Sequence, residues 1–161
     1  EVTRRALRNV HFRPYQPQSL LAESLAVADV HLVSLRPELE GLVVPSKIYG
    51  IMAAGRPAIF IGDPKGEVAN LIATFGFGAS VDAGKPDDLA HAIVELAHDA
   101  EAVKAMGASA RNAFEAKFTK QQSARDWHLL LSSLGTRDVE SVARDASTTL
   151  DVNPVKSQSR R

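Results

Sequence analysis

The chain has 161 residues, of which 45% are hydrophobic and 24% charged, a composition typical of a globular domain with its own core. Its formal net charge is zero, so no excess of positive charge favours binding to nucleic acid. The absence of cysteine excludes disulfides, thiolate metal sites and a cysteine nucleophile, and it fits a reducing compartment. No apolar run approaches the roughly 20 residues of a membrane-spanning helix, and no signal peptide is apparent.

The chain begins with Glu1 rather than methionine, and we expect it to be a fragment or a processed form.

Strand and helix patterns alternate along the chain. Four short strands are predicted, at about residues 10–13, 30–35, 58–62 and 79–82. Helices are expected at about 19–28, 46–54, 67–75, 86–96, 99–117 and 119–134. This alternation predicts an α/β fold, with a Rossmann-like parallel sheet flanked by helices.

The stretch from Val43 to Ile61 predicts a loop, a short helix and a buried strand. Pro45 and Ser46 are helix start signals, because proline suits the first turn and a serine side chain can cap free backbone N–H groups. Apolar residues at offsets of three and four then form one face, which consists of Ile48, Ile51 and Met52. Gly55 and Pro57 end the helix, and the apolar run 58–61 predicts a strand buried on both faces.

Ligands of parallel sheets bind beyond the carboxyl ends of the strands. Those ends are the loops at 13–18, 35–46, 62–67 and 82–86, which we call the rim. The helix that starts at Ser46 begins there, and Ser46 and Lys47 add a hydroxyl and an ammonium group to an end that attracts anions. Gly50 is unusual inside a helix. It indicates either close packing or a ligand lying against bare backbone.

An ordered series of segments resembles the donor-binding half of nucleotide-sugar-dependent glycosyltransferases with the GT-B fold, in the retaining family four. The series covers about residues 5–134 and includes N-V-H-F-R-P-Y-Q-P, A-D-V-H-L-V-S-L, L-E-G-L-V-V-P-S-K, P-S-K-I-Y-G-I-M-A-A-G-R-P and G-E-V-A-N-L-I. The resemblance implies a partial C-terminal domain over residues 1–135. It also implies transfer of a sugar, with anomeric retention, from a nucleoside diphosphate sugar to a glycan or lipid-linked acceptor.

The resemblance further implies that a missing N-terminal domain binds the acceptor, so the fragment alone would be inactive. The nucleotide sugar is a co-substrate, and no separate cofactor is expected. A role in polysaccharide biosynthesis and a cytoplasmic location follow from the same resemblance, with peripheral binding at the inner membrane as an option. Residues 136–161 lack aromatic residues and a sustained period, and we expect a disordered tail there.

The resemblance places donor contacts residue by residue. Pro45, Ser46 and Lys47 would bind the diphosphate, and Tyr15 and Gln16 would lie near the base. The surroundings of the sugar or ribose would be Gly41, Leu42, Val43, Val44, Gly50 and Glu67. Glu40 would join them by its position on the rim alone, because alignment with the family assigns it no role. The family commonly has two glutamates eight positions apart, but this chain has Leu42 and Gly50 at those positions. The glutamate that commonly holds the ribose in the family is therefore absent here, and no catalytic residue is assigned.

Each candidate also has a structural explanation. Lys47 could be a solvated lysine, Ser46 only a cap, and Glu40 a loop charge. Glu67 could serve as a cap alone, and Tyr15 could pack its loop. The five histidines show no metal-ligand spacing, so no metal site is predicted. Two other functions stay open: a non-catalytic nucleotide-sugar-binding or regulatory module, and a sugar-nucleotide epimerase of the same architecture.

Overall fold

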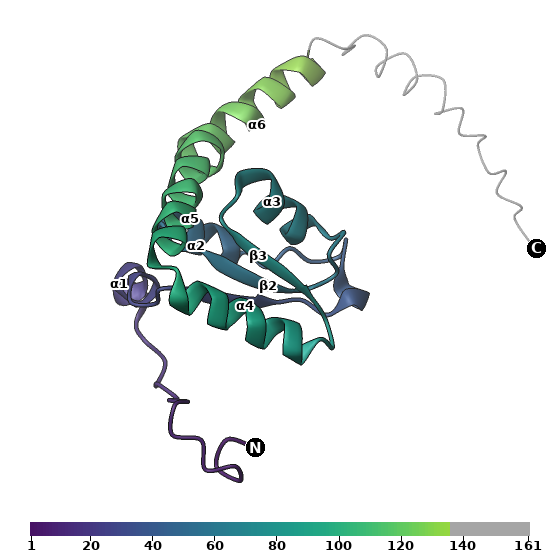
Figure 1. Cartoon of the computed structure of the whole chain (residues 1–161). Helices are drawn as coiled ribbons and strands as arrows, with labels where there is room; N and C mark the ends of the chain where they lie inside the picture. The colour runs from purple at the N-terminus through teal and green to yellow at the C-terminus, as the bar shows by residue number, and fades with distance from the viewer. Residues whose placement is uncertain (136–161) are drawn as a thin grey trace, which may run out of the picture. The chain divides into compact units, whose positions relative to one another are not determined.

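The structure, a computed structural model, describes residues 1–135 and has a parallel sheet at its centre (Figure 1). Three strands form the sheet in the order β1 (His31–Ser34), β2 (Ala58–Gly62) and β3 (Gly78–Asp82). Helices flank it, so the predicted Rossmann-like α/β class is confirmed. The chain divides into two compact units, 1–119 and 120–161, and the described part of the second is the helix α6 (Lys120–Gly135).

The helices follow the predicted order with shifted ends. They are η1 (Gln18–Leu20), α1 (Leu21–Ala26), η2 (Pro37–Leu39), α2 (Lys47–Ala53), α3 (Glu67–Phe75), α4 (Pro86–His98) and α5 (Ala100–Ala113). A π-helical segment, η3 (Phe114–Phe118), continues from α5, where the sequence predicted one uninterrupted helix over 99–117. The tail expected over 136–161 lies outside the described residues.

Of the four predicted strands, the first, at residues 10–13, does not form. Its two apolar residues stay exposed: 40% of Val10 and 83% of Phe12 are accessible. A strand needs a neighbour for its backbone N–H and C=O groups, and the sheet of the described residues ends at β1. Apolar and polar residues alternate over residues 10–13, as in a strand, but this pattern does not reveal whether a neighbouring strand is present.

The parallel register aligns the strand ends. His31 pairs with Ala58, and Ala58 pairs in turn with Gly78. At the other end, Leu35 N–H donates to the Ile61 carbonyl at 3.0 Å. The loops that follow the three strands therefore all lie at the carboxyl-terminal end of the sheet. This end is the rim that the sequence predicted.

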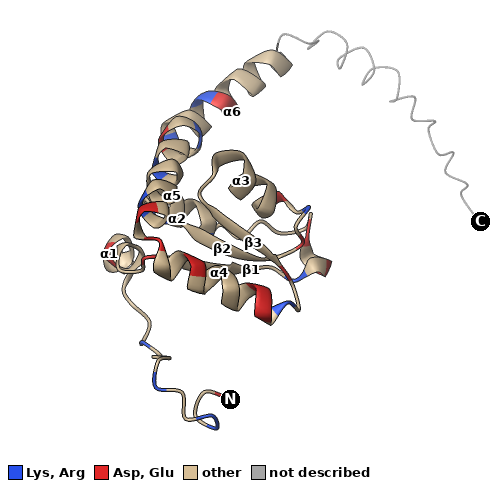
Figure 2. Cartoon of the chain, in the orientation of Figure 1, with Lys and Arg blue, Asp and Glu red and all other residues tan. Residues whose placement is uncertain are grey.

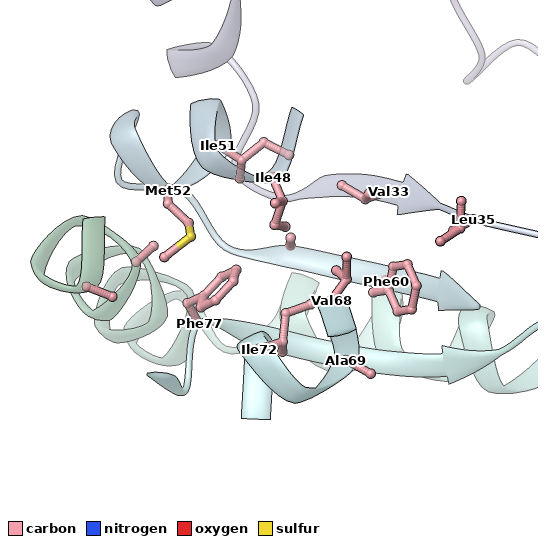
Figure 3. Packing of buried hydrophobic residues seen from close by; sticks show 13 residues of the cluster. Val33, Leu35, Ile48, Ile51, Met52, Phe60, Val68, Ala69, Ile72 and Phe77 are labelled. Atoms are coloured by element: carbon pink, nitrogen blue, oxygen red, sulfur yellow. The ribbon is translucent and has the colours of Figure 1, made fainter. Parts of the chain in front are cut away.

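The main core lies on the face of the sheet that carries Val33 and Phe60, where α2 and α3 pack (Figure 3). The predicted apolar face of α2 is confirmed, since Ile48, Ile51 and Met52 are all 0% exposed. The rest of this cluster is Leu35, Ala58, Val68, Ala69, Ile72, Phe77, Ala110 and Ala113. Fully burying one large apolar side chain contributes about 1.5–3 kcal/mol, so this side of the sheet carries most of the apolar stabilisation.

The opposite face is less well covered. Leu32 and Ile59 are register partners on that face; Ile59 is fully buried, whereas 47% of Leu32 is exposed. β1 is also one of the two edge strands, and its outer side pairs with no other strand of the described residues.

Helix α5 supports the end of α2. Gly55 ends α2 with a left-handed φ of 65°, as predicted, and Gly107 of α5 packs directly against it. A Cβ added at Gly107 would lie 2.4 Å from the Gly55 carbonyl oxygen. The Arg111 guanidinium donates to the Ala53 carbonyl near the end of α2, where a cation is favoured by the helix dipole.

We predict that Gly107→Ala destabilises the chain, although alanine usually favours a helix interior by about 1 kcal/mol relative to glycine. The added methyl group must push α5 away from Gly55, and overpacking of this kind costs about 1–3 kcal/mol. Urea unfolding should show a lower midpoint. The control, Ala108→Ser, lies at the neighbouring exposed position of α5 and should change the free energy of unfolding by less than about 0.5 kcal/mol. An unchanged or raised midpoint for Gly107→Ala would contradict this packing.

Candidate functional site

The rim gathers charges of both signs on the loops after the strands (Figure 2). The β1–α2 loop carries Glu38 and Glu40, and the β2–α3 loop carries Asp63 and Lys65 before Glu67 opens α3. The longest of these connections is the β1–α2 loop, residues 35–46, which contains most of the predicted site.

Ser46 and Lys47 lie at the start of α2, and both are exposed. Ser46 has helical angles, φ −57° and ψ −19°, and its side chain makes no capping hydrogen bond. The predicted serine cap is therefore wrong, because Ser46 already belongs to the first turn. That turn is closed by backbone bonds from Ile48 N–H to the Pro45 carbonyl at 3.0 Å and from Tyr49 N–H to the Ser46 carbonyl at 3.2 Å. The hydroxyl of Ser46 and the ammonium of Lys47 can thus meet a ligand from solvent.

Glu40 is directed into the protein rather than outward. Its Oε1 accepts a hydrogen bond of 2.8 Å from the backbone N–H of Glu67, the first residue of α3. Its Oε2 is buried and has no hydrogen-bond partner among the described residues. Glu40 therefore caps a helix that begins 27 positions later, a role that the sequence analysis did not foresee.

The neighbouring predicted residues differ in their environments. Gly41 has φ of 76°, a left-handed conformation that suits glycine, and the loop then turns toward α2. Leu42, Val43 and Val44 are exposed. A Cβ at Gly50 would lie 3.2 Å from Leu25 Cδ1 of α1. Close packing thus accounts for this glycine, and a ligand contact there stays a prediction.

Tyr15 and Gln16, predicted near the base, precede η1 in an irregular stretch. Tyr15 is 94% exposed, so it contacts little of the rest of the chain. The Gln16 side-chain amide donates to the Pro14 carbonyl at 3.0 Å, a local bond. The structure does not pack this pair against Ser46 or Lys47.

His31 is the first residue of β1, and its ring bonds to α1 and lies near the positive charges of Lys47 and Arg56. Its Nε2 donates to the Leu25 carbonyl at 2.9 Å. Burial lowers the pKa of His31 below its ordinary value of 6.5; the bond to Leu25 opposes this shift, while the charges of Lys47 and Arg56 add to it. The ring is therefore neutral at pH 7 and acts as a fixed donor.

An apolar hollow lies away from the rim. It measures about 890 Å³ and is lined by residues that precede β1 and β2 together with residues of α4 and α5. Its apolar lining includes Leu32, Ile59, Ile93, Leu96 and Val103. The hollow therefore belongs to the thinly covered face of the sheet and not to the predicted site.

The described residues contain neither a cluster of metal ligands nor a membrane-spanning helix. Within residues 1–135, no group of three or more His, Asp or Glu side chains is placed to hold a metal ion. The same residues include no helix long and apolar enough to cross a membrane.

Two curated proteins are similar to part of this chain. One is named as a probable glycosyltransferase, WbjE of Pseudomonas aeruginosa, and is 38% identical over 72 residues, 45% of this chain and 18% of the relative. The other is named as a glycosyl transferase of colanic acid biosynthesis, WcaI of Escherichia coli strain K12, and is 35% identical over 71 residues, 44% of this chain and 17% of the relative. The chain thus matches less than a fifth of the length of each relative. No family model and no solved structure matches it.

We predict that the free energy of unfolding falls as the pH drops below about 6.5. The pKa of His31 is lower in the folded state than in the unfolded chain. Between these two values the unfolded chain binds more protons, so acid favours unfolding. His31→Gln keeps a donor for the Leu25 carbonyl and removes the titration, so its unfolding temperature should depend less on pH between 7.5 and 5.5. His91→Gln, at an exposed position of α4, is the control and should keep the wild-type slope. Equal slopes for all three chains would exclude His31 as the source.

Proposed function

We propose that this chain is the donor-binding part of a glycosyltransferase that uses a nucleoside diphosphate sugar. The observation that carries the proposal is the similarity of 35–38% to two proteins named as glycosyltransferases. The parallel sheet with its rim of loops supports it, because such sheets commonly bind ligands beyond the carboxyl ends of their strands. In this proposal the chain is the C-terminal half of a GT-B fold.

The donor diphosphate would bind at Pro45, Ser46 and Lys47. Glycosyl transfer from such a donor releases a nucleoside diphosphate, and stabilising the charge on this leaving group lowers the barrier. Lys47 supplies a point charge and Ser46 a hydroxyl at the start of α2, where backbone N–H groups also point outward. Since α2 has only seven residues, the two side chains are an essential part of the proposed site.

The other ligand groups would follow from this placement. The sugar and ribose would lie toward Gly41–Val44, Gly50 and Glu67, and the base toward Tyr15 and Gln16. The acceptor, a glycan or lipid-linked sugar, would bind to a part of the longer protein outside this chain. Closure of two domains would exclude water from the reaction, and transfer would proceed with retention of the anomeric configuration.

A non-catalytic nucleotide-sugar-binding or regulatory module is the second candidate. It is favoured by one observation: Leu42 and Gly50 stand where the resemblance leads us to expect glutamates.

An epimerase of the same architecture would convert a nucleotide sugar without any acceptor. Product analysis with nucleotide sugar, with and without acceptor, distinguishes the three functions.

We predict that Lys47→Ala weakens binding of a nucleoside diphosphate to the full-length protein by about ten-fold or more, since loss of about 1.4 kcal/mol corresponds to one decade in affinity. Binding of the bare nucleoside should barely change, because it lacks the phosphates. Higher salt should narrow the difference between wild type and variant. Calorimetric titration with both ligands measures these effects.

Lys104→Ala removes an equal charge from α5 and is the control. Its affinity for the diphosphate should match that of the wild type. Equal diphosphate affinity for wild type and Lys47→Ala would remove Lys47 from the site. Equal losses for nucleoside and diphosphate would show that the substitution damages the fold instead.

A further inference from the structure

The β1–α2 loop is fixed to the sheet at both ends and has one polar anchor between them. At one end Leu35 N–H bonds to β2, and at the other Ile48 is fully buried. Between them 77% of Leu42 and 51% of Val43 are exposed, so apolar packing does little to hold the loop. The bond from Glu67 N–H to the Glu40 carboxylate is the contact that ties this middle part to the β2–α3 loop.

The neighbouring backbone is shaped to receive this carboxylate. Gly66, the N-cap of α3, is buried, and a Cβ added there would lie 2.5 Å from Oε2 and 2.6 Å from Cδ of Glu40. Its backbone angles, φ −70° and ψ 167°, are open to any residue. Glycine is therefore required for space and not for conformation. The glycine N-cap has no side chain with which to cap α3, and Glu40 supplies the missing acceptor from another loop.

We infer that Glu40 is a positioning residue that locks two rim loops together and thereby holds Ser46 and Lys47 in place for the donor diphosphate. We call the Glu40 carboxylate, Gly66 and the Glu67 N–H the Glu40 latch. The functional half of this inference rests on the proposed function. The latch replaces the direct sugar contact considered for Glu40, because Oε1 is bonded to α3 and Oε2 is buried. It also places a negative charge at the positive end of α3.

A double-mutant cycle of thermal unfolding in the full-length protein tests the latch without any ligand. Glu40→Ala removes the carboxylate, and Gly66→Ala displaces it, so each should lower the unfolding temperature of this domain by about 5 °C. The double variant should lose no more than either single variant, because both changes break the same contact. Additive losses would overturn the latch. Glu38→Ala, at an exposed position of the same loop, is the control and should leave the unfolding temperature unchanged.

Hydrogen exchange gives a second, local measurement. The Glu67 amide should exchange slowly in wild type and in Glu38→Ala, and rapidly in Glu40→Ala. Glu40→Gln keeps an acceptor oxygen and should restore most of the protection. Rapid exchange in the wild type would also overturn the latch.

Calorimetric titration with UDP, GDP and ADP at a temperature where every variant is folded tests the positioning role. If the wild type binds one of them, Glu40→Ala should weaken that affinity by about ten-fold, Glu40→Gln should recover most of the loss, and Glu38→Ala should match the wild type. Unchanged affinity in Glu40→Ala would overturn the positioning role. If the wild type binds none of the three, the proposed function fails and the positioning role fails with it, while the unfolding cycle and the amide exchange still decide whether the latch exists.

Discussion

Burial of the central strand is the constraint on which the rest of this structure depends. Ala58, Ile59 and Phe60 of β2 are all 0% exposed, and both sides of the strand are paired in parallel register. A strand in this position can have no polar face, and its neighbours must run in the same direction. Parallel neighbours need crossover connections, and these connections bring α2 and α3 onto the face that holds the main core. The rim follows directly, since strands that run together also end together.

The parts of the fold that depend on periodicity could be read from the sequence. The apolar run at 58–61 predicted a covered strand, and the spacing of Ile48, Ile51 and Met52 predicted the buried side of α2. These features are local, because the burial of each residue follows from its neighbours in the sequence. The failed strand at 10–13 shows the limit, since alternating Val10 and Phe12 describe a strand only when another strand accepts their backbone hydrogen bonds.

The site was less predictable because its contacts connect distant positions. Nothing in the pattern around Glu40 indicates that its carboxylate meets an amide 27 positions later. A weak signal was present in Gly66, a glycine directly before a helix, where a capping side chain is the usual choice. Ser46 misled for the opposite reason: its residue type suits a cap, but its backbone already belongs to the first turn. Binding of a ligand by Ser46, Lys47 and the surrounding loop residues stays a prediction.

The outer side of β1 has a consequence for handling the chain in solution. That side pairs with no strand of the described residues, and Leu32 is about half exposed beside an apolar hollow. The edge therefore offers both backbone groups and apolar surface to any extended segment that approaches it. Charged residues usually protect such edges, but the exposed side chains of β1 are Leu32 and Ser34. An exposed edge of this kind favours self-association in competition with the monomer as the concentration rises. Attaching further polypeptide that supplies a neighbouring strand would remove that competition and improve solubility.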